Sequence, residues 1–429
     1  MDKLPLEIIE AILSFLIGCG RLSQYATISR AWQKAVERSA FRSLHINSTD
    51  LDQFVGITAK RRTLLRHLTF TIKITLDIGR IRPRNQRLDR LSDAVTRSVR
   101  RLLQVLADEF DGQHGLTLTL GRIVFPSDAH HHNRSDDKHQ RIELIDHGRQ
   151  FPIVRGVSHL TLIVDADGRR VVLSAVVDLV KRLPNLESIL IWGEDADLID
   201  LRDKAAALYQ NDRQGLSDAL SDANFLTNSP CPPHVSLWLG RPDPMVLGMF
   251  PRFVFPDCVG PLGYDPLSAA VRNWSYGLEK IDIKGVFDSS LFWPAKQEPS
   301  NTSLSPSWPR LKQFYVNLAL PTPSGGWYFD HTPNTRRRDA PCEETLQPLV
   351  ASWARALESM PVLAQARLAF EVETLLNMAD VASETSVEDW SLRYQAPGVS
   401  FDPLNRPWEI GLDTSDLHSA RLFLKNCGN

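Results

Sequence analysis

The stretch that decides the fold is LPNLESILI, residues 183–191, whose apolar residues stand at its first, fourth, seventh and ninth positions. The same spacing recurs in VRGVSHLTL (154–162), WPRLKQFYV (308–316) and MPVLAQARL (360–368). The end of each copy alternates with period two, which is typical of a short strand, and its leading residues close the preceding helix. Each copy therefore predicts a turn followed by a strand with one buried face.

Further strands and helices surround these copies. Partial copies end at Phe70 and Ile283, and two more strands are predicted in GLTLTL (115–120) and VSLWL (235–239). Before two of the copies, apolar residues with helical spacing predict a helix. These helices are indicated by Val172, Val176, Leu179, Val180 and Leu183, and by Leu346, Leu349, Val350, Trp353 and Leu357.

This alternation permits two folds. Helix, turn, short strand and loop form the unit of a leucine-rich-repeat solenoid, although a regular array keeps one period of about 20–29 residues. The full copies begin at irregular intervals, at positions 154, 183, 308 and 360. An ordinary α/β fold also alternates helices with strands. Because every copy uses the same offsets, we favour an irregular leucine-rich-repeat-like α/β solenoid.

Long loops are predicted to interrupt the solenoid. Four segments are rich in Pro, Ser, Asn, Asp or charged residues, a composition that favours loops over regular elements. They lie at about 126–150, 211–234, 294–307 and 321–345.

The composition restricts the class of protein. The chain has 429 residues with 49 basic and 51 acidic side chains, so its charge gives no reason to expect nucleic acid or a membrane as a partner. Its five cysteines are scattered without a Cys-x-x-Cys pair, which argues against a disulfide scaffold and a zinc module. No apolar run approaches the ~20 residues of a membrane span. We therefore expect a cytoplasmic or nuclear protein, or one found in both compartments.

A second informative stretch is LPLEIIEAILSFL, residues 4–16. On a helix its polar members Glu7, Glu10 and Ser14 fall into one narrow stripe, and apolar side chains cover most of the remaining surface. The acidic residues disfavour a secretory signal, and the run is too short for a membrane span. Two interpretations remain: a helix buried within its own domain, or a helix with one face for its own core and another for a partner.

The residues that follow favour the second interpretation. The segment 22–29 predicts a short second helix, and the spacing of Trp32, Ala35 and Val36 predicts a third. Residues 1–46 would then form a small helical module with more apolar surface than it can bury alone. Such a surface usually marks an interaction site.

The N-terminal module resembles an F-box. In that family Leu-Pro-x-Glu-Ile/Leu opens the first helix and Ser-Arg-x-Trp follows after a short gap, as LPLEIIEAILSFL and ATISRAWQKAV do here. The resemblance covers residues 1 to about 46 and leaves 47–429 as a substrate-recognition region. It implies docking on the Skp adaptor of an SCF-type cullin–RING ubiquitin ligase. The positions that it assigns to the adaptor-binding surface, or to residues that support this surface, are Leu4, Pro5, Ile8, Ile9, Ile12, Leu13, Leu16, Ile28 and Trp32. PTPSGGWYFDH (321–331) is similar to a segment of many filamentous-fungal F-box-like proteins, which suggests a fungal source.

Catalytic and metal sites are not expected. His130, His131 and His132 lie among acidic residues, but consecutive histidines in a polar loop point in different directions and do not converge on a metal. The chain shows no nucleophile elbow, phosphate-binding glycine loop or His-Glu-x-x-His motif. We therefore predict no enzyme activity and no cofactor.

A basic segment is the first candidate for contact with a substrate. Arg80, Arg82, Arg84 and Arg87 could receive an acidic or phosphorylated segment, because guanidinium groups pair with carboxylate and phosphate. A solvated basic loop explains the same residues without any ligand.

The sequence leaves three hypotheses about function. In the first, the chain is a substrate receptor that joins an unknown protein to the ligase. In the second, it is a non-catalytic scaffold whose F-box-like helices bind Skp alone, or merely cap the solenoid as repeat arrays require. In the third, an enzyme is fused to an F-box, which would need polar residues converging in a pocket.

Overall fold

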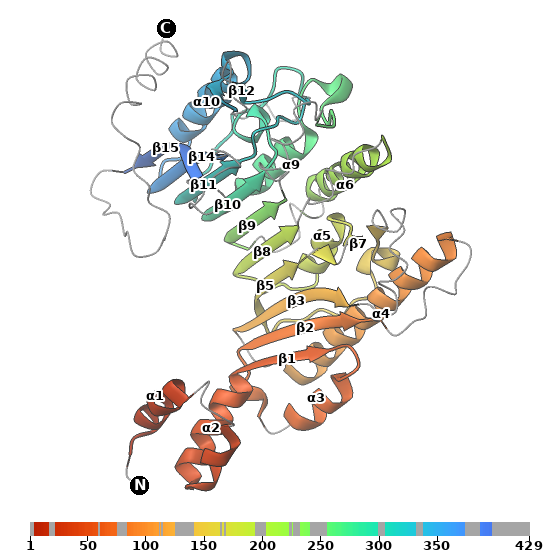
Figure 1. The fold of residues 1–429 in the computed structure, drawn as a ribbon, viewed down its shortest axis with the longest axis vertical. Coiled ribbons are helices and arrows are strands. Elements are labelled where there is room, and N and C mark those ends of the chain that lie inside the picture. Colours follow the sequence, from red (N-terminus) through yellow and green to blue (C-terminus); the bar gives the residue numbers. More distant parts are fainter. Residues whose placement is uncertain are drawn as a thin grey trace, which may run out of the picture. The chain divides into compact units, whose positions relative to one another are not determined.

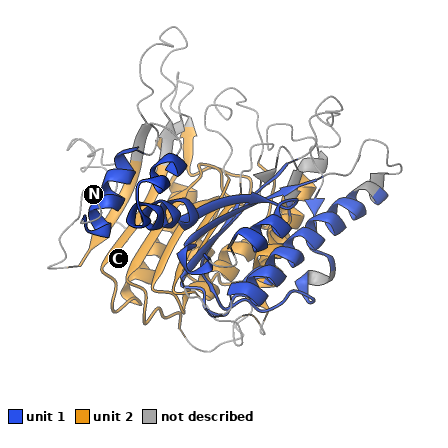
Figure 2. Ribbon diagram, turned by 90° about the horizontal axis from the view of Figure 1, so that it is seen from below, with its two compact units in different colours: residues 1–171, 178–187 blue, residues 172–177, 188–429 orange. Residues whose placement is uncertain are grey.

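The computed structural model describes residues 4–16, 22–58, 61–74, 84–110, 112, 115–124, 141–163, 165–166, 169–193, 203–222, 225, 232–240, 255–298, 305–331, 338–373 and 387–396. The chain forms two compact units (Figure 2). Residues 1–171 and 178–187 make up unit 1, and residues 172–177 and 188–429 make up unit 2. Each unit is mixed α/β, with strands that are mostly parallel.

The N-terminal helices of unit 1 lie where the sequence predicts them. Helix α1 (Leu6–Leu16) is followed by the 3₁₀-helix η1 (Leu22–Thr27) and by α2 (Arg30–Arg42). Ser29 caps α2, because its hydroxyl oxygen accepts a hydrogen bond from the Trp32 amide at 3.5 Å. Helix α2 leads directly into strand β1 (Ser43–Asn47), so the predicted module boundary at residue 46 falls within a strand.

Unit 1 continues with a parallel sheet (Figure 1). The strands β1, β2 (His67–Lys73), β3 (Leu116–Val124) and β5 (Val157–Ile163) pair in this order, and all three pairings are parallel. Its other elements are α3 (Leu51–Thr58), η2 (Arg62–Leu64), α4 (Arg84–Phe110), β4 (Arg141–Ile142), η6 (Ile145–Gly148), β6 (Asp165–Ala166) and β7 (Arg169–Val171). Helix α5 (Ser174–Val180) contributes residues to both units.

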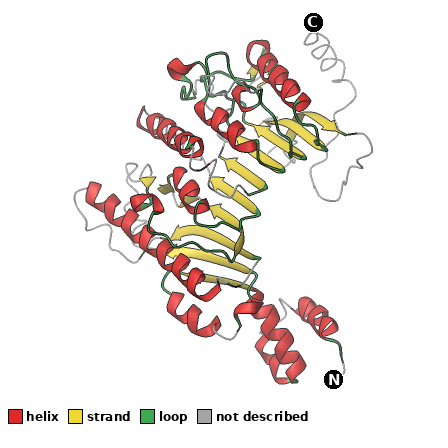
Figure 3. Ribbon diagram, turned by 180° about the vertical axis from the view of Figure 1, so that it is seen from behind, coloured by secondary structure: helices red, strands yellow, loops and turns green. Residues whose placement is uncertain are grey.

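Unit 2 is built around six strands, and the helices lie on one side of them (Figure 3). In chain order these strands are β8 (Ser188–Gly193), β9 (His234–Leu239), β10 (Lys280–Gly285), β11 (Gln313–Leu318), β14 (Gln365–Glu373) and β15 (Val387–Gln395). Each pairs with the next, in parallel except for the antiparallel pair β14–β15. The spatial order of the strands therefore follows the chain order throughout. In doubly wound α/β folds, by contrast, the strand order reverses within the sheet. The remaining elements are α6 (Asp203–Ser221), η8 (Gly260–Leu262), α9 (Pro266–Ser275), η9 (Ser289–Leu291), β12 (Phe329–His331), β13 (Arg338–Pro341) and α10 (Glu343–Glu358).

The recurring apolar spacing marks the repeating unit of the sheet. The strands predicted from the four full copies, the two partial copies and the two additional stretches are all confirmed, as are the helices α5 and α10. Every apolar position of the full copies is buried: Val154, Val157, Leu160, Leu162, Leu183, Leu186, Ile189, Ile191, Trp308, Leu311, Phe314, Val316, Met360, Leu363, Ala366 and Leu368. The first two positions of each copy thus anchor the turn in the core, and the last two anchor the strand.

Three of the four predicted loops contain regular structure, and to that extent the loop predictions are wrong. Helix α6 extends to Ser221 and so occupies the start of the segment 211–234. The segment 126–150 contains β4 and η6, and the segment 321–345 contains β12, β13 and the first turn of α10. These elements are short or carry polar residues, which gave them the composition of loops. In 294–307 the described residues form no helix or strand.

Candidate functional site

The first candidate site is the exposed side of α1. Leu4, Ile8, Ala11 and Phe15 are exposed. Ile8, Ala11 and Phe15 are three or four residues apart and therefore lie on one face of α1, and Leu4 comes two residues before the helix begins. Ile8 is 48% exposed and Phe15 is 83% exposed, which is unusual for side chains of this size in a folded module. We refer to these four residues as the α1 stripe.

The opposite side of α1 forms the core of the helical module. Ile9 and Leu13 are buried together with Trp32, Ala35 and Val36 of α2. The prediction that one face of α1 packs in the core of its own module is therefore confirmed.

The nine residues assigned to adaptor binding divide between these two sides. Leu4, Pro5, Ile8 and Ile28 are exposed, and Ile12 and Leu16 are half-buried. Ile9, Leu13 and Trp32 are buried in the module core. Their role is to hold α1 and α2 together beneath the exposed residues.

The second candidate site is the side of the unit 2 sheet that faces away from its helices. The strand register places three rows of side chains there. The rows are Ser188, His234, Lys280, Gln313, Gln365 and Gln395; Leu190, Ser236, Asp282, Tyr315, Arg367 and Arg393; and Trp192, Trp238, Lys284, Asn317, Ala369 and Ser391. We call these eighteen residues the open face. Nearly all of them are half-buried or exposed, whereas the alternating residues on the other side form the core.

Aromatic and polar contacts order parts of the open face. The rings of Trp192 and Trp238 meet edge to face with their centroids 6.4 Å apart. The Lys284 ammonium lies 4.5 Å from the centre of the Trp238 ring, a cation–π distance. The Tyr315 hydroxyl donates a hydrogen bond of 2.5 Å to the Gln365 side-chain oxygen. A face of this composition can bind a polypeptide through both apolar and charged side chains.

The basic segment predicted as a substrate contact is only partly within the described residues. Arg80 and Arg82 lie outside them, as do His130, His131 and His132. Arg84 and Arg87 lie in the first turns of α4, so this part of the segment is a helix and not the loop of the alternative interpretation.

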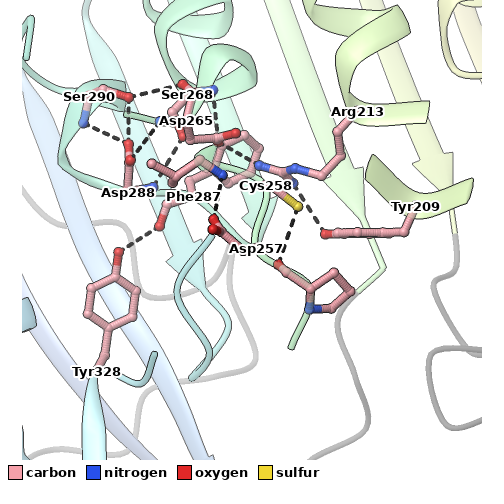
Figure 4. Close-up of polar contacts among 12 residues, drawn as sticks. Tyr209, Arg213, Asp257, Cys258, Asp265, Ser268, Phe287, Asp288, Ser290 and Tyr328 are labelled. Carbon is pink, nitrogen blue, oxygen red and sulfur yellow. Dashed lines mark hydrogen bonds and ion pairs between the residues drawn. The ribbon is translucent and has the colours of Figure 1, made fainter. Parts of the chain in front are cut away.

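A buried polar network in unit 2 was not predicted (Figure 4). Arg213 of α6 forms an ion pair with Asp265 at 2.5 Å, and both side chains are almost completely buried. Asp265 also caps α9, where it accepts hydrogen bonds from the amide and the hydroxyl of Ser268. Its own amide donates to Asp288 at 2.9 Å, and Asp288 accepts from the amide and the hydroxyl of Ser290. The network joins α6, the start of α9 and the loop after β10.

The charges within this network determine its electrostatics. Burial disfavours the charged form of Arg213, but the adjacent Asp265 outweighs this effect and raises the pKa of the guanidinium. Burial, together with the charge of Asp265, raises the pKa of Asp288 to about 6. Because Arg213, Asp265 and Ser268 are buried, we assign the network to positioning the connecting loops rather than to contact with a ligand.

The raised pKa of Asp288 predicts a pH dependence of stability. Between about pH 4 and pH 6 the folded chain keeps a proton on Asp288 that the unfolded chain has lost, so the contribution of this group to stability falls as the pH rises. Asp288→Asn keeps the size of the side chain and removes the charge. We therefore compare the free energy of unfolding of the variant with that of the original chain at the same pH. The difference, variant minus original, should be about 2–3 kcal/mol larger at pH 7 than at pH 4. Urea unfolding at both pH values measures this difference, and a difference that stays constant would contradict the shifted pKa.

No family model matches the chain, and no curated protein matches it. The described residues contain no group of three or more His, Cys, Asp or Glu side chains that could hold a metal ion. None of their helices has both the length and the apolar character required to cross a bilayer.

Proposed function

We propose that the chain is a substrate-receptor subunit of an SCF-type cullin–RING ubiquitin ligase, and that the α1 stripe docks on the Skp adaptor. The exposure of Leu4, Ile8 and Phe15 above a folded helical core is the observation that carries this proposal. Full burial of an exposed side chain of this size contributes about 1.5–3 kcal/mol. Phe15, which is 83% exposed, would gain most of that amount, and Leu4 and Ile8, which are 41% and 48% exposed, would gain somewhat under half of it. A partner with a complementary groove would recover this free energy.

A capping role for the same helices accounts less well for these side chains. Helix α2 continues directly into β1, and an end cap would need such a direct connection to the sheet. However, the cap of a repeat array has a polar outer face, because its function is to shield the apolar core from water. The exposed Ile8 and Phe15 increase the apolar surface instead.

In this proposal, residues 47–429 form an irregular leucine-rich-repeat-like solenoid in the cytoplasm or nucleus, and the open face receives the substrate. The sequential order of parallel strands and the burial of every copy of the recurring spacing support the solenoid. Catalysis would belong to other subunits of the ligase, and this chain would contribute proximity between the substrate and the ubiquitin carrier.

Charged residues in the α1 stripe should abolish docking without unfolding the module. The double variant Ile8→Asp, Phe15→Asp is expected to weaken binding to the purified Skp adaptor about a hundredfold, because two central apolar contacts become buried charges. Both positions are exposed in the free chain, so the change in the free energy of unfolding should remain small. Isothermal titration calorimetry measures the affinity, and circular dichroism verifies the fold.

Ile57 supplies the matched control, because it is 52% exposed on α3 and lies outside the stripe. Ile57→Asp should bind the adaptor as tightly as the original chain. Equal affinity of the stripe variant and the control would show that the α1 stripe is not the docking surface.

A further inference from the structure

A polar cavity lies within unit 1, where the N-terminal helices meet the start of the sheet. Its volume is about 800 Å³, and it is lined by α1, the end of α2, η2 and the first residues of β1 and β2. The charged or titratable side chains on its wall are Glu10, Arg38, Arg42, Arg66 and His67. With the histidine neutral, three arginines and one glutamate give the wall a net charge of +2. We call this cavity the arginine pocket.

Two of the three arginines have no counterion. Arg38 forms an ion pair with Glu10 at 3.1 Å, which joins α2 to α1. Within the described part of the chain, no carboxylate pairs with Arg42 or Arg66, and both residues are exposed. The backbone holds these two residues next to each other, because the Arg66 amide donates a hydrogen bond of 2.9 Å to the Arg42 carbonyl. An anion in the pocket would supply the negative charge that these two guanidinium groups lack.

Other acidic residues on the same elements do not offset this charge. Besides Glu10, the elements that line the pocket contain the acidic residues Glu7 and Glu37. Glu7 lies in the first turn of α1 and is not part of the wall. Glu37 accepts an ion pair from Arg61 at 3.0 Å, so it already has a partner of its own. The excess of positive charge is therefore a property of the pocket.

We propose that the arginine pocket binds a phosphate monoester. The forked guanidinium groups of Arg42 and Arg66 form charge-assisted hydrogen bonds with phosphate oxygens. A phosphate monoester carries about −1.5 to −2 charges at pH 7, which matches the +2 of the wall, whereas a carboxylate carries a single charge. The hydroxyl groups of Ser14, Ser39 and Thr63 also line the pocket and can donate to the remaining oxygens.

The size of the pocket leaves room for the ester group as well as the phosphate. A volume of about 800 Å³ is within the range of sites for small molecules, roughly 300–1,000 Å³. A phosphorylated side chain of a polypeptide and a small phosphorylated molecule share this chemistry. The inference does not depend on the proposed function, because Glu10 and Ser14 belong to the polar stripe of α1, and docking uses the α1 stripe.

Two phosphorylated probes test this inference on the full-length chain alone. The first is glycerol 3-phosphate, followed by isothermal titration calorimetry. The second is a fluorescein-labelled peptide of glycines and serines with one central phosphoserine, followed by fluorescence anisotropy. At least one probe should bind about tenfold or more tightly than its form without phosphate, and its affinity should fall as salt is raised. The tighter of the two shows whether the ester belongs to a polypeptide or to a small molecule, and binding of neither probe would overturn the inference.

Neutral variants identify the site that holds the phosphate. Arg42→Gln, Arg66→Gln should lower the affinity for the bound probe at least about tenfold, because both charge-assisted contacts are lost. Arg30→Gln, Lys34→Gln is the matched control, since it removes two positive charges from exposed positions of α2 that are not part of the wall. The control should bind the probe as tightly as the original chain, and circular dichroism verifies the fold of both variants. Equal affinities of the two double variants would overturn the inference.

The adaptor is absent from this assay, so its outcome is separate from that of the docking proposal. Ile8→Asp, Phe15→Asp should bind the phosphorylated probe normally, and Arg42→Gln, Arg66→Gln should bind the adaptor normally. Failure of phosphate binding with intact adaptor binding would refute the arginine pocket as a phosphate site and leave the proposed function in place.

Discussion

Replacing Arg213 with leucine is expected to lower the free energy of unfolding of unit 2 by about 3–5 kcal/mol. The guanidinium is the buried partner of Asp265, and it also lies over the rings of Tyr209 and Phe287. Leucine fills part of the space but leaves the Asp265 carboxylate buried without its ion-pair partner, next to Asp288. Since a buried charge without compensation is far more costly than a missing surface pair, the loss should be large. Urea unfolding followed by tryptophan fluorescence measures it.

Arg310→Leu is the matched control for this variant. Arg310 pairs with Glu279 at 2.7 Å, but its side chain is well exposed and Glu279 keeps a second partner in Lys312. The loss should be below about 1 kcal/mol. If Arg213→Leu were no more destabilising than Arg310→Leu, the buried network would not hold the loops of unit 2 in place.

Replacing Trp308 with alanine is expected to lower the free energy of unfolding by about 3–5 kcal/mol. Trp308 is the first residue of a recurring copy and is completely buried, and its indole nitrogen donates a hydrogen bond of 2.6 Å to the Ser275 hydroxyl. Its ring also meets Tyr276 edge to face at 5.1 Å. Alanine removes these contacts and leaves a cavity at the turn before β11. Thermal and urea unfolding both report the loss.

Trp192→Ala removes a side chain of the same size from the open face, where Trp192 is 42% exposed. It should cost about 1–2 kcal/mol, less than Trp308→Ala, because Trp192 keeps much of its ring in water and its main ring contact is with Trp238. Similar losses for the two tryptophans would show that the first position of the recurring copy does not anchor the core.

The strands could be predicted from the sequence because their buried residues are contiguous in the chain and repeat at fixed offsets. Helix α6 was missed for the opposite reason. Its buried face consists of Tyr209, Arg213, Leu216, Ser217 and Leu220, so polar residues occupy positions where a helical pattern would show apolar ones. Helix α4 begins within a basic segment, and its buried leucines and valines lie further along the chain.

The candidate sites were predictable to different degrees. The sequence predicted a two-faced α1 but could not distinguish the core residue Ile9 from the exposed Ile8, because both are apolar and adjacent. The buried network could not be found, since Arg213 and Asp265 meet only in the folded chain. A local signal did exist: Asp265 followed by Pro266 is a typical start of a helix. The open face depends on strand register, which the recurring spacing alone does not give.

The most direct test of the proposed function is a pull-down of the full-length chain from a cell lysate, probed for both the Skp adaptor and the cullin. The proposal predicts that the intact chain and Ile57→Asp recover both proteins, whereas Ile8→Asp, Phe15→Asp recovers neither while remaining folded. Recovery of the adaptor without the cullin would contradict the ligase role and favour a scaffold. Recovery of neither protein by the intact chain would contradict the docking role of the α1 stripe.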